Sequence, residues 1–573
     1  MILTDAQKKD VYEKARRYVD AEQDSHFRKE IVDALEEHAD EELFDRFYTS
    51  LAFGTAGMRG VIGGGTNRMN PFMVRKVTQG LAEYLVDTDS APSVVIAFDS
   101  RNYSSTFAEQ AAVTLCANGV SVMLYSTLHP VPMLSFAVRE LQATAGIVIT
   151  ASHNPAKYNG YKVYWSDGGQ VTPPHDVGIS ARVQAVDITT IKHMEHGEAV
   201  SEGLLSEVPA WVDEAYYKMV LASLRRPALV QGSPITIAYT PLHGSGNIPV
   251  RTLMERLSLQ CEVVAAQESP DGDFPTVSMP NPEDPQAMRL AIELAKEKKA
   301  DIVLGTDPDA DRLGVAIPVD DSKQSYHLLS GNQIAVLLCD YLISTWKELG
   351  SDPTCQPLVV KSLVTTDLVA DITKNNGGVC VDVLTGFKYI AEQIADLETK
   401  LDQFFLFGCE ESFGYLTVPH VRDKDAVSTA LCAVEMMSYH SSRNTTLQQR
   451  LDEIYQMYGY HTESVLSFSY EGSAGKKKMQ DIMADFRAKR SGDSFAGFAI
   501  TQVQDLLEGP EKTGFPKSDV IILRFATGEK LVVRPSGTEP KIKYYLFFNA
   551  KGEALDTFQA SLNARIARFK AAL

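Results

Sequence analysis

Strand-like and helix-like segments alternate repeatedly along this chain, and no other feature constrains its fold as strongly. Residues 93–99 (SVVIAFD) predict a buried strand, residues 107–117 a helix and residues 120–125 a second strand. A helix is also predicted at residues 285–298, and further strands at residues 236–239, 301–304, 358–359 and 378–383. Such alternation is typical of α/β domains. The sequence therefore predicts related α/β domains in series, although the repeat is one of pattern and not of sequence identity.

The chain is too long for a single hydrophobic core. Its 573 residues would form three to five domains of about 100 to 200 residues each. We expect linkers at the polar stretch 202–209, the turn-rich stretch 319–325 and the segment 457–462. These linkers predict domains at residues 1–205, 206–325, 326–457 and 458–573.

The last part of the chain differs in character from the rest. Short strands are predicted near residues 521–525, 530–533 and 542–548, followed by a closing helix from Ala554. This order of elements lacks the strand–helix alternation of the earlier segments. We expect a separate α+β domain here.

Composition narrows the classes of partner. The formal net charge of −19 argues against nucleic acid or an anionic membrane held by general electrostatics, although a local basic pocket could still bind an anionic substrate. The chain shows no signal-peptide pattern and no run of about 18 apolar residues. Its seven cysteines include no CxxC pair, which favours reduced thiols over disulfides or zinc. We expect a cytoplasmic protein.

The first chemical motif is TASHNP, which follows a predicted strand and contains Ser152. A serine on a turn after a strand can project its hydroxyl into a cleft, and Pro155 and Gly160 keep the chain out of regular structure. A turn with capping Ser and Asn side chains would look the same. The glycine-flanked elbow of serine hydrolases is absent.

The second motif is TDPDADR, directly after another predicted strand. In an extended loop Asp307, Asp309 and Asp311 would alternate, so that three carboxylates converge on one Mg²⁺ or Ca²⁺. Calcium sensing of the EF-hand type fails, because Arg312 and Pro318 stand where that loop needs glycine and glutamate. An exposed acidic loop is the alternative. Magnesium beside an arginine is what phosphoryl transfer requires.

The third motif is FGCEESFGY, followed by VRDKDAV. Glu410 and Ser412 are two residues apart, so in an extended loop they would share one face and could bind vicinal sugar hydroxyls. Lys424 in the second segment could equally form a surface ion pair. Neither segment indicates a function by itself.

The fourth motif is RPSGTEPKIKYY. Arg534 supplies a guanidinium fork, Ser536 and Thr538 supply hydroxyls, and Gly537 allows a run of backbone N–H groups to face one ligand. An ordinary β-turn explains the Pro and Gly but not the flanking Arg and hydroxyls. The motif predicts a phosphate clamp.

Together these motifs resemble those of the α-D-phosphohexomutase family. TASHNP is similar to the family's phosphoserine loop, TDPDADR to its metal loop, CEESFGY to its sugar loop and RPSGTEPKIK to its phosphate loop. All four occur in the family's order across nearly the whole chain. The sugar loop lacks the histidine of the family's phosphomannomutases and looks most like the longer bacterial-type phosphoglucomutases, a subgroup related to animal phosphopentomutases.

The resemblance implies four domains around a central cleft, three of them α/β and the last a smaller α+β domain. In chain order they would carry the phosphoserine, the metal, the sugar-recognition and the phosphate-binding loops. Ser152 would be phosphorylated in the resting enzyme, with Mg²⁺ bound by Asp307, Asp309, Asp311 and an oxygen on Ser152. The remaining expected catalytic residues are Arg59, His153, Lys162 and Lys424. The expected substrate-binding residues are Thr385, Gly386, Lys388, Glu410, Ser412, Arg422, Arg534, Ser536, Gly537 and Thr538.

The resemblance also implies an activity, that of an intramolecular phosphotransferase of the isomerase class. The leading expectation is interconversion of glucose 1-phosphate and glucose 6-phosphate, with glucose 1,6-bisphosphate as intermediate and activator. We expect only small-molecule sugar phosphates as partners, and a monomer or weak dimer. Phosphopentomutase, phosphomannomutase and sugar-1,6-bisphosphate synthase are the alternatives, and a sugar-phosphate binding protein without catalysis is a more distant one.

Overall fold

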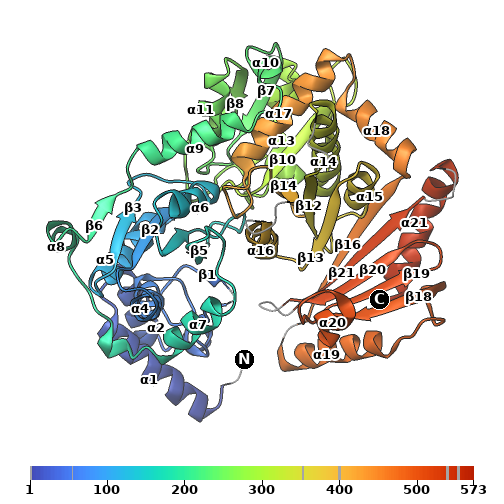
Figure 1. The fold of residues 1–573 in the computed structure, drawn as a ribbon. Coiled ribbons are helices and arrows are strands. Elements are labelled where there is room, and N and C mark those ends of the chain that lie inside the picture. The colour runs from blue at the N-terminus through green and yellow to red at the C-terminus, as the bar shows by residue number, and fades with distance from the viewer. Residues whose placement is uncertain are drawn as a thin grey trace. The chain divides into compact units, whose positions relative to one another are not determined.

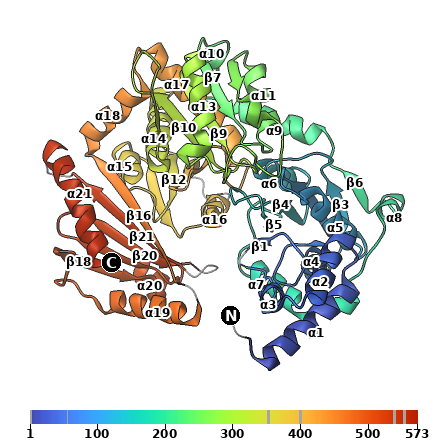
Figure 2. The same ribbon diagram turned by 180° about the vertical axis from the view of Figure 1, so that it is seen from behind.

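The computed structural model describes residues 3–54, 56–350, 354–397, 402–470, 472–536, 541–550 and 555–573. The chain divides into two compact units. The first comprises Met1–Gly331, Ala391–Lys400 and Ser412–Ser442, and the second Asn332–Ile390, Leu401–Glu411 and Arg443–Leu573. Figures 1 and 2 show the helices and strands of both units from two sides.

The first unit begins with a mixed sheet of order β1-β5-β4-β2-β3-β6. Strands β2, β3, β4 and β6 are parallel, whereas β5 runs antiparallel to both β4 and β1. Side chains alternate across the sheet, so that Val94 and Ile96 join a core with α4 and α5 while α6 packs against the same strands. The strands are β1 (Gly57–Val61), β2 (Ser93–Phe98), β3 (Ser121–Leu124), β4 (Ala145–Ile149), β5 (Tyr158–Trp165) and β6 (Leu205–Glu207).

Helices surround this sheet, and their ends follow from local side chains. For α4, the Asn70 side chain accepts a hydrogen bond from the backbone of Met73, and Pro71 stands in the first turn. The helices are α1 (Asp5–Ala21), α2 (Ser25–Glu36), α3 (Asp40–Phe47), α4 (Pro71–Thr88), α5 (Ser104–Cys116), α6 (Val131–Glu140), α7 (His175–Ala185) and α8 (His196–Ser201).

A second sheet follows in the same unit, with order β11-β10-β9-β7-β8. Helix α13 packs on β7 and β9 and begins where the Asp284 side chain caps the backbone of Gln286. The strands are β7 (Thr236–Thr240), β8 (Gln260–Val263), β9 (Ile302–Thr306), β10 (Leu313–Pro318) and β11 (Tyr326–Leu328). The helices are α9 (Trp211–Ala222), α10 (Pro227–Val230), α11 (Asn247–Arg256), α12 (Ala265–Glu268) and α13 (Pro285–Lys298).

Two of the expected linkers contain or adjoin strands of these sheets. Residues 319–325 connect β10 to β11, which pair antiparallel, so this stretch is a hairpin turn and not a linker. The stretch 202–209 contains β6, which pairs with β3. The same turn-forming residues occur in hairpin turns and in linkers between domains. Only the pairing of the flanking strands distinguishes a hairpin turn from a linker. The domain limits stay a prediction.

The second unit contains a parallel sheet in which β12 lies between β13 and β14. Its strands are β12 (Gln356–Ser362), β13 (Val379–Val383) and β14 (Gln403–Glu410). The helices of this stretch of the chain are α14 (Gly331–Glu348), α15 (Leu368–Asn375), α16 (Phe387–Leu397) and α18 (Leu447–Tyr458). Strand β15 (Gly414–Leu416) and helix α17 (Ala426–Ser442) belong to the first unit.

The chain ends in an antiparallel sheet of order β16-β21-β20-β19-β18-β17. Ile521 and Leu523 face a core with α19 and α21, whereas Ile522 and Val532 pack with Leu363 after β12. The strands are β16 (His461–Ser469), β17 (Ser494–Phe495), β18 (Phe498–Asp505), β19 (Ile521–Phe525), β20 (Lys530–Pro535) and β21 (Lys541–Asn549). The helices are α19 (Gly472–Ala488), α20 (Pro510–Thr513) and α21 (Leu555–Ala572).

The α/β arrangement of the first three sheets with their helices, and the α+β arrangement of the last sheet with its helices, confirm the predicted fold class. Within the part of the chain that the structure describes, no helix is both long enough and apolar enough to cross a bilayer.

Candidate functional site

Ser152 stands on the turn that follows β4, as predicted. Its side chain is almost buried, with 6% of the residue exposed. The hydroxyl donates to Asp307 Oδ2 at 2.6 Å and lies 3.2 Å from His153 Nδ1. The φ angle of Ser152 is +52°, a left-handed conformation that costs a residue other than glycine about 1 kcal/mol. Such strain at a buried hydroxyl is typical of a functional site.

The three aspartates of TDPDADR lie between β9 and β10. The loop is a turn and not the extended segment that we expected, because the backbone N–H of Ala310 donates to Asp307 O at 2.9 Å and Ala310 has a φ of +48°. The turn still brings the carboxylates together. Asp307, Asp309 and Asp311 are all buried, and each offers an oxygen within 4.8 Å of the others.

The electrostatics of this cluster favour a bound cation. Burial, together with the charges of Asp309 and Asp311, raises the pKa of Asp307 well above its ordinary value. Asp309 Oδ1 and Asp311 Oδ1 are buried and have no hydrogen-bond partner among the described residues. Buried carboxylate oxygens are rarely left without a partner, and oxygen ligands suit Mg²⁺. The residues present therefore fit a magnesium ion.

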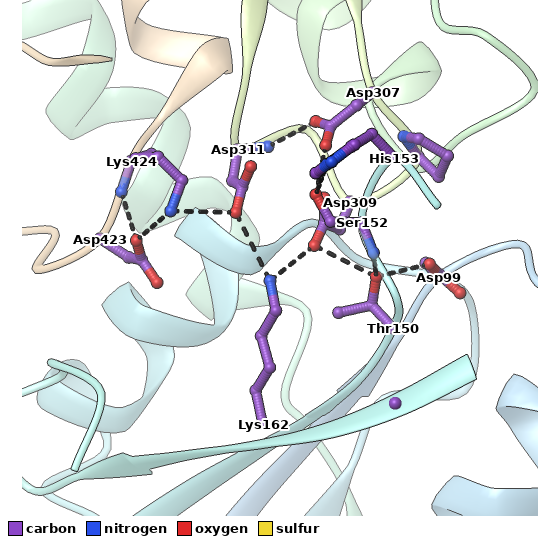
Figure 3. Close-up of polar contacts among 12 residues, drawn as sticks. Asp99, Thr150, Ser152, His153, Lys162, Asp307, Asp309, Asp311, Asp423 and Lys424 are labelled. Carbon is purple, nitrogen blue, oxygen red and sulfur yellow. Dashed lines mark hydrogen bonds and ion pairs between the residues drawn. The ribbon is translucent and has the colours of Figure 1, made fainter. Parts of the chain in front are cut away.

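Two lysines flank the aspartates (Figure 3). Lys162 extends from β5, and its Nζ lies 2.9 Å from Asp309 Oδ2 and 3.5 Å from Asp311 Oδ2. Lys424 Nζ lies 3.2 Å from Asp311 Oδ2. Burial acts to raise the pKa of Asp311, but Lys424, Lys162 and Arg312 outweigh it and hold that pKa below its ordinary value. The site thus combines buried carboxylates with cations that could contact a phosphoryl group.

Asp423 was not among the predicted site residues, yet it holds one of these lysines. It accepts from Lys424 Nζ at 2.9 Å, from the Tyr164 hydroxyl at 2.8 Å and from Gln170 Nε2 at 2.8 Å. Tyr164 stands on β5, two residues after Lys162, so β5 carries one lysine and, through Tyr164 and Asp423, contacts the other. The segment VRDKDAV contains Asp423, but nothing local distinguishes it from a surface acid.

Arg59 and His153 lie close to Ser152. Arg59 is an exposed residue of β1, where it pairs with Gly160 of β5, and its charge acts on His153. Burial and the charge of Arg312 lower the pKa of His153 well below its ordinary value. Because Arg59 pairs with Gly160, two residues before Lys162, Arg59 and Lys162 share one face of the first sheet.

Arg422 and Ser412 also belong to the first unit. Arg422 is buried, and its backbone N–H donates to the Ser135 hydroxyl at 2.9 Å. Ser412 stands in a turn that ends at Phe413, whose φ is +65° and whose carbonyl accepts from the backbone of Leu313 at 3.0 Å. The expected extended path from Glu410 to Ser412 is therefore wrong. Directly after the turn, Gly414 forms an isolated bridge with Arg312, next to the metal loop.

The second unit contains a further group of expected substrate-binding residues, namely Thr385, Gly386, Lys388 and Glu410. Glu410 ends β14, and its Oε1 accepts from the backbone of Gly386 at 2.8 Å. Thr385 Oγ1 is buried without a hydrogen-bond partner among the described residues. The Lys388 ammonium lies 5.3 Å from the centroid of the Tyr389 ring. The loop before α16 and the end of β14 thus form one polar patch.

The phosphate-clamp residues are described only in part. Arg534 stands on β20, and the backbone N–H of Ser536 donates to Lys541 O at 2.8 Å. Gly537 and Thr538 lie outside the described residues. Arg534 acts on the pKa of Tyr545, as do Glu411 and Glu410. Arg534 and the sugar-loop carboxylates therefore lie in one electrostatic neighbourhood.

Known proteins are similar to this chain over most of its length. Three models of the phosphoglucomutase/phosphomannomutase family match this chain: alpha/beta/alpha domain I at residues 50–189, domain II at 214–319 and domain III at 330–458. A phosphoglucomutase of Staphylococcus aureus is 36% identical over 547 residues, covering 93% of this chain and 95% of that protein. One of Staphylococcus epidermidis is 36% identical over 527 residues, covering 90% and 94%.

Solved structures show the same fold. The parafusin phosphoglucomutase of Paramecium has a TM-score of 0.70 at 18% identity, covering 91% of this chain and 95% of that one. A phosphoglucomutase/phosphomannomutase family protein of Burkholderia thailandensis has a TM-score of 0.65 at 18% identity, covering 90% and 97%.

Proposed function

This chain belongs to the phosphoglucomutase/phosphomannomutase family, and on that premise we propose that it is a phosphoglucomutase, interconverting glucose 1-phosphate and glucose 6-phosphate. The observation that carries the proposal is the Ser152 hydroxyl, 2.6 Å from Asp307 Oδ2 inside a cluster of carboxylates and lysines. Phosphoglucomutases among its relatives support the choice of glucose. Its partners are small-molecule sugar phosphates, and it works as a monomer or weak dimer.

Ser152 carries the phosphoryl group in this proposal. The bond between phosphorus and Ser152 Oγ breaks as a bond forms to a hydroxyl oxygen of the bound monophosphate, which loses its proton. The product, glucose 1,6-bisphosphate, reorients and returns its other phosphate to Ser152. Arg59, His153, Lys162 and Lys424 are the candidates for proton transfer or charge stabilisation. The support is that His153 Nδ1 lies 3.2 Å from the hydroxyl, that the Arg59 charge acts on His153, and that both lysines contact the neighbouring aspartates. The work of these four candidates is positioning and electrostatics.

Asp307, Asp309 and Asp311 would hold Mg²⁺, with an oxygen on Ser152 as a further ligand. When bound, the ion supplies positive charge that offsets the charge of the transferring group. The buried carboxylate oxygens without hydrogen-bond partners support this assignment. Lys162 and Lys424 add fixed positive charge beside the same carboxylates.

Sugar recognition is assigned to the polar patch of the second unit, and Ser412 and Arg422 of the first unit are further candidates for substrate binding. Glu410 and the hydroxyl of Thr385 offer hydrogen-bonding groups for sugar hydroxyls, supported by the contact of Glu410 with Gly386. Lys388 offers a cation beside them. Arg534, with Ser536, Gly537 and Thr538, would bind the phosphate that is not being transferred.

A mutase assay on the wild type and on Ser152→Ala tests the proposal. We expect glucose 1-phosphate to be converted by the wild type only, and intact-protein mass spectrometry to show about 80 Da of added phosphoryl mass on the wild type only. Ser180→Ala on α7 is the control and should behave like the wild type. A phosphate that maps to another residue would contradict the assignment. Comparing kcat/KM for glucose, mannose and ribose 1-phosphates tests the sugar, and a requirement for an acyl phosphate donor would favour bisphosphate synthase.

A further inference from the structure

One buried arginine contacts most of the backbone around Ser152. Arg101 lies just after β2, and its side chain is wholly buried. Its guanidinium donates to Ser152 O at 2.6 Å, to Pro155 O at 3.0 Å, to Tyr158 O at 3.0 Å and to Asn154 O. One side chain thus binds four carbonyl oxygens between Ser152 and the first residue of β5.

The chemistry of this contact is specific to arginine. Ser152 and Asn154 lie in the turn after β4, so their carbonyls lack the ladder partners that a strand would give, whereas Pro155 O also accepts from the Tyr158 N–H at 3.0 Å and Tyr158 begins β5. A guanidinium offers five N–H donors in a fixed plane, whereas the lysine ammonium is a point charge with three. Arginine is therefore better suited than lysine to bind several carbonyls at fixed relative positions. The arginine therefore determines the path of the loop.

That path includes the strained residue. Ser152 has a φ of +52°, and strain of this kind persists only where the surroundings hold it. Two contacts hold it here: Arg101 binds the Ser152 carbonyl, and the Ser152 N–H donates to Thr150 Oγ1 at 2.8 Å. They fix the peptide groups on both sides of the residue. The Ser152 hydroxyl is thereby directed at Asp307.

Arg101 is itself held in place. Its Nε lies 3.4 Å from Asp99 Oδ2, and that same carboxylate oxygen lies 2.6 Å from the Thr150 hydroxyl. Figure 3 shows Thr150 between Asp99 and Asp309. The ring of Phe274, from the segment before α13, faces the guanidinium, with 5.0 Å between Arg101 Cζ and the ring centroid. Residues that follow β2 and β4, together with Phe274 from the segment between α12 and α13, thus fix the arginine.

We propose that Arg101 is a positioning residue for phosphoryl transfer, which keeps Ser152 in its left-handed conformation and its hydroxyl aimed at the three aspartates. The inference rests on the proposed function, because it assumes that Ser152 accepts and donates the phosphate. Arg101 acts through Ser152 and touches no substrate. Its loss should slow transfer to and from Ser152 and leave sugar-phosphate binding nearly unchanged, because a small misplacement of reacting atoms is costly.

Arg101→Lys keeps the positive charge and removes the fork. The matched control is Arg46→Lys, because Arg46 donates to Gly64 O at 2.8 Å and pairs with Glu30, away from Ser152. For each variant we would measure the melting temperature, KM for glucose 1-phosphate and the single-turnover rate at which dephosphorylated enzyme takes phosphate from glucose 1,6-bisphosphate onto Ser152. Mass spectrometry follows that last step.

For Arg101→Lys we expect a transfer rate at least about tenfold lower, with KM changed less than about twofold. Arg46→Lys should keep the wild-type transfer rate even where its melting temperature falls. If Arg101→Lys does not fold, Phe274→Leu, which removes the ring over the guanidinium, should show the same pattern to a smaller degree.

A folded Arg101→Lys enzyme with the wild-type transfer rate would overturn the inference alone. An Arg101→Lys enzyme whose KM rises by the same factor as its transfer rate falls would also overturn the inference. If the wild type takes no phosphate on Ser152, the proposed function fails and the inference fails with it, so the wild-type arm separates the two results.

Discussion

Asp423 holds Lys424 against the metal-site carboxylates: its Oδ1 lies 2.9 Å from the lysine Nζ, which also lies 3.2 Å from Asp311 Oδ2 (Figure 3). Asp423→Asn removes the charge that fixes this ammonium but keeps the shape of the side chain. Removing one partner of a buried charged hydrogen bond costs about 1.5–3 kcal/mol, so we expect kcat to fall at least about tenfold. Steady-state kinetics with glucose 1-phosphate measures this.

Tyr164→Phe provides a graded comparison, because it removes one neutral donor to Asp423 and leaves the lysine contact. Its effect on kcat should be smaller than that of Asp423→Asn. The exposed pair of Arg68 and Asp45 offers a control in Asp45→Asn, which should leave kcat unchanged. Equal kcat values for Asp423→Asn and the wild type would show that Asp423 does not position Lys424 for catalysis.

The three aspartates predict dependence on a divalent cation. Asp309→Asn should weaken magnesium binding in titration calorimetry and lower kcat at least about a hundredfold, because one of the buried carboxylates then carries no charge. Chelation of the wild type should abolish turnover, and added Mg²⁺ should restore it. Asp320→Asn in the exposed turn between β10 and β11 is the matched control. Full turnover in the presence of the chelator would refute the metal assignment.

The sequence predicted the helices and strands whose limits are set by residues within or next to the element itself. Helix α13 has the predicted bounds because Asp284 and Pro285 mark its start, and β19 coincides with its apolar run. The short strands β6 and β11 were not predicted, since each has only three residues and is defined by its pairing partner. A three-residue strand has no periodicity to detect.

The residues of the candidate site also fall into two groups: those that a local motif predicts, and those that only contacts between distant segments bring together. The carboxylates of TDPDADR lie close together in the sequence, so their convergence could be predicted even though the loop turned out to be a turn. Contacts between distant segments could not be derived locally: Ser152 meets Asp307 across 155 positions, and Asp423 meets Tyr164 across 259. The family resemblance supplied the first pair. Nothing in the sequence singled out Asp423 or Arg101, because a lone acid or base has no pattern.

Glu411 gives the stability of the protein a pH dependence. Burial, with a further contribution from Glu410, raises the pKa of Glu411 from 4.5 to about 7, while Ser362 Oγ donates to it at 3.0 Å and Lys543 partly opposes the shift. A raised pKa in the folded state means that stability is present below pH 4.5 and is lost as the pH rises through about 7. The loss is at most about 3 kcal/mol.

Glu411→Gln removes this titration. The difference in melting temperature between the variant and the wild type should therefore shift in favour of the variant as the pH rises from about 5 to about 8. Glu508→Gln, an exposed acid, should follow the wild type at every pH. A constant difference between Glu411→Gln and the wild type across this range would show that Glu411 titrates normally.

Arg534 should bind the phosphate that is not being transferred. A charged hydrogen bond contributes about 1.5–3 kcal/mol, so Arg534→Ala should lower kcat/KM for glucose 1-phosphate at least about tenfold. The same contact would retain the bisphosphate while it reorients, so the variant should release more of it and need more added glucose 1,6-bisphosphate. Arg568→Ala, which removes an arginine of α21 that lies over Phe498, controls for the loss of a cation in this part of the chain. Escape of the intermediate and the rate of turnover are separate readouts. An Arg534→Ala enzyme with unchanged kcat/KM and an unchanged requirement for glucose 1,6-bisphosphate would therefore exclude the phosphate-clamp assignment, even if the mutase activity itself were confirmed.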